Sequence, residues 1–376
     1  MFAGVAILAL VLSFSQAEGC GSASTRIHSL AFSRDGQQLA AAKLNWRNAN
    51  VSLKSYAADI ARTISLIDVD SASATKVVDR GFIAGNQGPA TEFLRQDNES
   101  FGFNSDGASL FFLSFGGGGI RRIDLKSGEI TGFINLGPND EVLSFVLSQD
   151  RTVVAATSWN SGVCLVDADD AKQIVSDPNL FAFSPFRPNL GLSANNRWVG
   201  TLESDKLNLF DATAKLRAGP TFPCSGAFAF GPRADQFAVV EENNLSICDL
   251  TTNETRILPH TGEITLVKFM DEETLVATTG SEVILLDIAS GKVTKWFRDQ
   301  EYVTALATSP DGKTVAIGDS QGNVILWDTT TGDSSIVQVP GRSGYPWTPP
   351  AGILAALALY AYSRRKRPIS GQVVQH

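Results

Sequence analysis

The sequence predicts an all-β fold, a seven-bladed β-propeller of four-stranded antiparallel blades over residues 25–340, followed by a C-terminal transmembrane helix. The first observation is a short apolar run closed by aspartate that occurs seven times, at intervals of 38 to 56 residues. The second is a set of turn signals at regular spacing, and the third is the absence of a helical period between them. The closing aspartates are Asp68, Asp124, Asp167, Asp211, Asp249, Asp287 and Asp328.

Each repeat also contains a turn ahead of its closing aspartate. The clearest examples are Ser33-Arg34-Asp35-Gly36, Asn104-Ser105-Asp106-Gly107 and Ser309-Pro310-Asp311-Gly312. Asp, Asn and Gly suit these positions because they accept turn dihedrals and bond their own backbone. A second turn follows each closing aspartate, so every unit holds four short strands in about forty residues.

The apolar runs of these strands are nearly continuous rather than strictly alternating. Residues 152–157 and 314–318 are examples of such second strands. A four-stranded sheet cannot bury both faces alone, but sheets stacked around an axis bury both. We therefore expect each blade to be covered by its two neighbours.

The repeats resemble the WD-repeat family. The stretch 303–328, with Ser309-Pro310-Asp311-Gly312 and Trp327-Asp328, resembles a WD-repeat blade, and Pro259-His260 resembles the Gly-His loop with Pro for Gly. The unit around Asp124 is equally similar to the related YVTN-type repeat. One unit of seven keeps the Trp-Asp pair and one keeps the His. The resemblance therefore implies a buried Asp-His-Ser-Trp network that is incomplete in most blades, with apolar packing in its place.

The first unit is longer than the others. Residues 44–60 are predicted to be an insertion between its second and third strands, and residues 80–98 a connection to the next blade. Insertions protrude from one rim of a propeller and are natural contact surfaces. The candidate partner contacts are Trp46, Arg47, Lys54 and Tyr56; the alternative is a loop that packs over its own blade.

The N-terminus is predicted to be a signal peptide, residues 1–17. Its first 14 residues carry no charge, and Ser15-Gln16-Ala17 places small residues where a signal peptidase reads. The alternatives are an uncleaved anchor, lipidation at Cys20, and a segment that is not an export signal, in which case the propeller faces the cytoplasm.

The C-terminus is predicted to cross a membrane once. A Pro/Gly linker at residues 341–350 precedes the core of the helix at residues 351–363, which extends from residue 345 if its uncharged flank is included. Residues 364–376 form a basic tail, whose Arg364, Arg365, Lys366 and Arg367 favour the cytoplasmic side. The competing interpretation is a processed sorting tail. With both ends as predicted, the protein is a single-pass protein of the cell membrane with its propeller outside the cytoplasm.

Composition narrows the function classes. The net charge of −8 argues against a nucleic-acid binder, and three histidines leave little material for a zinc site. The closing aspartates are predicted to start turns, so we assign no catalytic, metal-binding or cofactor-binding residue. Pairing of Cys20 with Cys224 stays open.

The sequence thus favours a non-catalytic, membrane-tethered scaffold that binds a protein or peptide partner. The alternative is an exported propeller enzyme of the quinoprotein-like dehydrogenase or calcium-dependent lactonase type, whose acids come together from distant blades.

Overall fold

A computed structural model describes residues 24–52, 55–84, 101–113, 119–134, 142–158, 162–178, 180, 190–203, 205–242, 244–258, 263–298 and 301–340. The chain divides into two compact units, Met1–Gly341 and Arg342–His376, and every described residue belongs to the first. The described ranges contain no helix with the length and apolar character needed to cross a membrane. The predicted signal peptide and the predicted membrane helix lie outside these ranges.

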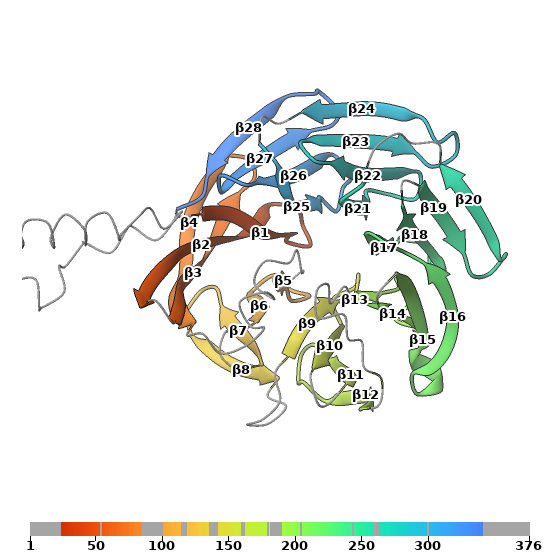
Figure 1. The fold of residues 1–376 in the computed structure, drawn as a ribbon, viewed down its shortest axis with the longest axis horizontal. Helices are drawn as coiled ribbons and strands as arrows, with labels where there is room; N and C mark the ends of the chain where they lie inside the picture. The colour runs from red at the N-terminus through yellow and green to blue at the C-terminus, as the bar shows by residue number, and fades with distance from the viewer. Residues whose placement is uncertain are drawn as a thin grey trace, which may run out of the picture. The chain divides into compact units, whose positions relative to one another are not determined.

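The described strands form seven antiparallel sheets of four consecutive strands each, which we number blade 1 to blade 7 in chain order (Figure 1). The first strands are β1 (Ser24–Phe32), β5 (Phe101–Phe103), β9 (Val142–Leu147), β13 (Leu190–Leu192), β17 (Phe228–Phe230), β21 (Leu266–Phe269) and β25 (Val303–Thr308). The second strands are β2 (Gln38–Ser52), β6 (Ser109–Leu113), β10 (Val153–Ser158), β14 (Trp198–Glu203), β18 (Gln236–Glu241), β22 (Thr274–Thr279) and β26 (Thr314–Asp319).

The third strands all end at a closing aspartate. They are β3 (Ser55–Asp68), β7 (Ile120–Asp124), β11 (Gly162–Asp167), β15 (Lys206–Asp211), β19 (Asn244–Asp249), β23 (Glu282–Asp287) and β27 (Asn323–Asp328). The fourth strands are β4 (Ser73–Ala84), β8 (Ile130–Ile134), β12 (Gln173–Asp177), β16 (Arg217–Pro223), β20 (Glu254–Leu258), β24 (Val293–Arg298) and β28 (Ser334–Gln338), and a 3-10 turn, η1 (Ala212–Ala214), precedes β16. The predicted seven-bladed propeller of four-stranded sheets is confirmed.

The hydrophobic core consists of seven clusters, and each lies between two adjacent blades. One cluster joins blade 1 to blade 2, another joins blade 2 to blade 3, and so on to the cluster that joins blade 7 back to blade 1. The second strands are accordingly buried along their length, as in β10, whereas fourth strands such as β16 are mostly exposed. Burial by both neighbours explains why the second and third strands read as continuous apolar runs.

The ring closes without exchange of a strand between its ends. The first strand of each blade contacts the first strand of the next, and β25 contacts β1. Blade 7 supplies its own fourth strand, β28, so blades 7 and 1 meet only through their faces. At this seam the Thr304 hydroxyl donates to the carbonyl oxygen of Ile27 at 2.6 Å, and the Lys43 ammonium donates to the carbonyl oxygen of Val339 at 3.0 Å. Stability of the ring therefore depends on close packing at this seam.

Blade 1 differs from the others in the length of its strands. β2 has 15 residues and β3 has 14, whereas the second strands of the other blades have five or six. Residues 44–60, predicted to be an insertion, continue the two strands as a paired hairpin, and β4 continues beside β3 to Ala84. The sheet of blade 1 therefore extends beyond the ring through backbone hydrogen bonds, which do not depend on the pattern of side chains.

Candidate functional site

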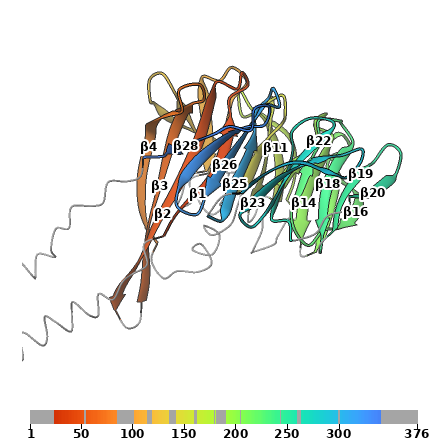
Figure 2. The same ribbon diagram turned by 90° about the horizontal axis from the view of Figure 1, so that it is seen from above.

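The strands end at two faces of the ring that differ in the turns they carry. Because the sheets are antiparallel, the turns from first to second strand and from third to fourth strand lie at the same face, which we call the turn face. The turns from second to third strand lie at the opposite face. The hairpin of blade 1 (residues 46–60) protrudes there (Figure 2), so we call it the hairpin face.

Three of the four candidate partner contacts lie among the described residues of this hairpin. Positions 46, 47 and 56 lie on the paired backbones of β2 and β3, where position 46 pairs with 60, 47 with 59 and 56 with 50. These are Trp46, Tyr56 and Arg47. Lys54 lies outside the described residues, as do the basic residues Arg364–Arg367.

The closing aspartates lie on the turn face, where each begins the turn to the fourth strand. In every blade the carboxylate accepts a hydrogen bond from a backbone N–H two or three residues later. Hydrogen bonds from Ser127 hold the pKa of Asp124 below its usual value, and bonds from Thr330 and Thr331 do the same for the pKa of Asp328. Each of these carboxylates therefore accepts hydrogen bonds from its own turn and stabilises that turn.

Among the described residues, no group of three or more His, Cys, Asp or Glu side chains is arranged to hold a metal ion. The buried thiol of Cys224 lies 3.6 Å from the carbonyl oxygen of Ala227, and Cys20 lies outside the described ranges.

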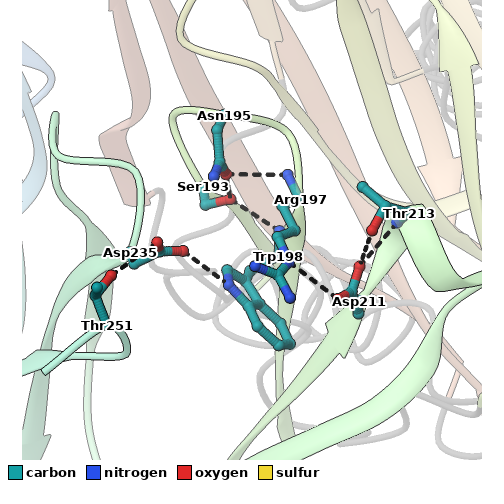
Figure 3. A network of polar contacts seen from close by, with 8 residues as sticks. All are labelled: Ser193, Asn195, Arg197, Trp198, Asp211, Thr213, Asp235 and Thr251. Atoms are coloured by element: carbon teal, nitrogen blue, oxygen red, sulfur yellow. Dashed lines mark hydrogen bonds and ion pairs between the residues drawn. The ribbon is translucent and has the colours of Figure 1, made fainter. Parts of the chain in front are cut away.

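A polar network on the turn face joins blade 4 to blade 5 (Figure 3). The Trp198 indole N–H donates to Asp235 Oδ1 at 3.0 Å, and the Thr251 hydroxyl donates to Asp235 Oδ2 at 3.0 Å. The Arg197 guanidinium stacks over the Trp198 ring at 4.8 Å and donates to Asp211 at 3.0 Å. A closing aspartate is thereby linked to the neighbouring blade as well as to its own turn.

Substitutions of Asp211 test whether a closing aspartate serves to start its turn or to bind a ligand. Its carboxylate accepts from the Thr213 backbone N–H at 2.9 Å and the Thr213 hydroxyl at 2.6 Å. We expect Asp211→Ala to lower the free energy of unfolding by about 1 kcal/mol, as for the loss of a helix N-cap. Asp211→Asn keeps an acceptor for Thr213 and gives up only the ion pair with half-exposed Arg197, which contributes little. Urea denaturation of both variants checks this, and equal losses would contradict the turn-starting role.

The centre of the ring holds a cavity of about 900 Å³. Its walls come from the first strands of blades 1, 3, 4, 5, 6 and 7. Glu242, in the turn between β18 and β19, and Glu263, ahead of β21, lie toward the hairpin face, whereas Lys268 lies on β21 closer to the turn face. The cavity wall is thus acidic toward one mouth and basic toward the other.

Lys268 has an unusual position among the first strands. In each blade, the backbone N–H of one residue just after the first strand donates to a backbone carbonyl oxygen at the start of the second strand. This shared hydrogen bond is a common reference point at which the seven blades can be compared. The residue two positions before this N–H is Lys268 in blade 6, and it is Ala, Gly or Val in the other six blades. Desolvation by the surrounding walls lowers the pKa of Lys268 to about 8. Alignment of the repeats on the turns after their first strands shows this lysine, whereas alignment on the closing aspartates of the third strands does not.

Comparison with known proteins supports the repeat assignment. Residues 291–328 match the family described as "WD domain, G-beta repeat". The chain is a seven-bladed propeller with one segment that matches a WD repeat. Among curated proteins, no match was found. Among solved structures, a chain of the "Crystal Structure of Mitotic Checkpoint Complex" is similar with a TM-score of 0.58 and 15% identity, over 81% of this chain and 87% of that chain. At this identity the likeness shows the fold alone.

The matched segment runs from the turn before β24 through β27 and ends at Asp328. Trp327, of the Trp-Asp pair, is buried and packs against Phe297 of blade 6 with ring centroids 5.7 Å apart. The tryptophan of this pair therefore contributes to packing between two blades.

Proposed function

We propose that this WD-repeat-like propeller is a non-catalytic scaffold that binds a protein or peptide partner on its hairpin face. The observation that carries the proposal is the extension of β2 and β3 beyond the ring, since the other blades have no comparable second strand in their described residues. A two-stranded ribbon rooted in a rigid ring offers a partner backbone edges and side chains on two faces.

The second part of the proposal is a membrane tether that holds the propeller outside the cytoplasm. It rests on the 19 uncharged residues from 345 to 363, which approach the ~20 needed to span a bilayer, and on the four basic residues that follow. The uncharged N-terminal segment, residues 1–17, supports export.

Affinity capture tests the partner site. The full chain, tagged on its C-terminal tail, is recovered from detergent-solubilised membranes as wild type and as a variant with Ala at Trp46, Arg47, Lys54 and Tyr56. We expect the variant to retain less than a tenth of the partner recovered by wild type, because interface energy concentrates in aromatic and Arg side chains. The matched control places Ala at four exposed residues of fourth strands: Ile174, Ile257, Val293 and Trp296. Equal recovery by the hairpin variant and wild type would contradict the assignment.

Protease treatment of intact cells tests the location. An exported propeller is expected to be cut in intact cells, whereas a propeller facing the cytoplasm is protected until the membrane is permeabilised. The enzyme alternative is tested separately, since stoichiometric metal or quinone in the purified chain would favour it.

A further inference from the structure

We propose that the outer rim of blades 5 to 7 lies on the surface of an anionic lipid bilayer, with Trp296 and Ile336 at the headgroup level. The fourth strands β20, β24 and β28 form this rim and follow one another along the outside of the ring (Figure 1). The inference rests on the membrane tether of the proposed function and adds to it the side of the ring that meets the membrane.

The rim exposes large apolar side chains. Trp296 on β24 is 66% exposed, Ile336 on β28 is 70% exposed and Ile257 on β20 is 63% exposed, and Val293 on β24 is also exposed. Of the six large apolar side chains that the described residues expose, these four lie on three consecutive outer strands. Single apolar residues scattered over a surface are ordinary, whereas a concentration of them marks an interaction site.

The same rim is basic, although the chain as a whole carries a net charge of −8. On β20, on β24 and at the position before β24 lie one acid, Glu254, and four exposed cations, Arg256, Lys292, Lys295 and Arg298. Arg298 is paired with Glu282 of the neighbouring strand. Arg256 and Lys295 donate to backbone carbonyl oxygens of the next blade, which carry no net charge, so both cations still attract anions.

β24 combines tryptophan with cations in a way that suits a bilayer surface. Lys295 directly precedes Trp296, and Arg298 follows it by two residues. Indole rings are favoured at the headgroup level, where one edge is apolar and the other wet, and basic side chains are attracted by anionic headgroups. Interfaces between proteins are depleted in lysine, and two of the four cations here are lysines. The composition therefore favours a lipid surface over a protein partner.

The course of the chain after blade 7 favours the same rim. Strand β28 ends at Gln338, and the uncharged segment that we propose to enter the membrane begins at residue 345. The residues between them reach at most about 20–25 Å when fully extended. A tether of this length holds β28, and β24 beside it, closer to the bilayer than the far side of the ring.

Fluorescent probes at two exposed isoleucines test this orientation. An environment-sensitive dye is attached to the full chain after Ile336→Cys on the rim or, as the matched control, after Ile174→Cys on β12 of blade 3. Wild type treated in the same way gives the background from the native cysteines. Each chain is reconstituted into phosphatidylcholine vesicles with about one third phosphatidylglycerol, washed at alkaline pH and returned to neutral pH. Acrylamide quenching then measures the exposure of each dye to water.

We expect the quenching constant at position 336 to be no more than about a third of that at position 174, because the bilayer shields the rim. Lys292→Gln together with Trp296→Ala is expected to raise quenching at position 336 at least twofold. Lys172→Gln together with Ile174→Ala, the same change on blade 3, is expected to leave it unchanged. All these side chains are exposed, so the variants are expected to fold as wild type.

The outcomes separate the rim from the tether. Equal quenching at the two positions, in a chain that stays in the vesicles through the wash, overturns the rim proposal and leaves the tether standing. Loss of the chain in the wash contradicts the tether and, with it, this proposal. Protection of position 336 in a native membrane extract but not in lipid vesicles would assign the rim to a protein partner and overturn the proposal.

Discussion

Phe237→Ala is expected to lower the free energy of unfolding by about 3–5 kcal/mol, the usual cost of removing a buried aromatic ring. Phe237 on β18 is completely buried in the cluster between blades 4 and 5. Its ring packs edge-on against Phe222 at 4.8 Å and tilted against Phe230 at 5.9 Å between centroids. Because Phe222 belongs to blade 4, the substitution opens a cavity between two blades.

The matched control for this prediction is Ile336→Ala on the outer strand β28, where 70% of the side chain is exposed. Surface changes of this kind stay within about 0.5 kcal/mol. Urea denaturation followed by tryptophan fluorescence compares the two variants. A loss for Phe237→Ala no larger than that for Ile336→Ala would show that the blades do not pack through this cluster.

Gly318→Val is expected to destabilise the ring by about 3 kcal/mol at the upper end of overpacking costs, and Gly318→Ala by about 1–2 kcal/mol. Gly318 lies on β26, and a Cβ atom there would meet Cγ2 of Ile27 at 2.5 Å and Cβ of Ile27 at 2.6 Å. Ile27 is completely buried on β1 across the seam between blades 7 and 1. Relief requires the first and last blades to separate, since the contact involves the base of a β-branched side chain.

Gly132→Ala on β8 is the control for the seam substitution, because a Cβ atom at that position has no heavy atom within 4 Å. Alanine restricts the backbone of the unfolded chain more than glycine does. Gly132→Ala is therefore expected to leave the free energy of unfolding unchanged or to raise it by up to about 1 kcal/mol. Thermal melting of the two alanine variants makes the comparison. Similar melting temperatures for Gly318→Ala and Gly132→Ala would mean that the seam is open.

The repeat could be predicted from the sequence because its markers are local. Each closing aspartate follows its strand directly and bonds its own turn, so Asp124 or Asp328 can be recognised without knowing the neighbouring blade. The spacing of these turns then gives the number of blades, and the continuous apolar runs indicate burial on both faces.

The contacts between blades could not be predicted in the same way. The bond from Trp198 to Asp235 and the packing of Phe222 on Phe237 join residues of different repeats, and spacing does not show which side chains meet. The hairpin of blade 1 is predicted as an insertion, residues 44–60, because the first repeat is longer than the others. Residues 44–60 pair because they continue β2 and β3 of the sheet, and the composition of the segment does not indicate this pairing.

The same difference between features of one repeat and features shared by several repeats applies to the candidate site. The hairpin could be found as an excess of length within one repeat, whereas Lys268 requires the seven first strands to be compared at one level of the ring. The cavity itself exists only when the blades are assembled, so its charge pattern has no signature in a single repeat.

An electron-density map of the full chain, at a resolution that traces the strands, tests the central claim most directly. We predict seven four-stranded sheets around one cavity, with β1 packed by its face on β25 and Ile27 against Gly318. A different number of sheets, an open sandwich, or a first strand hydrogen-bonded into the last sheet would contradict the account.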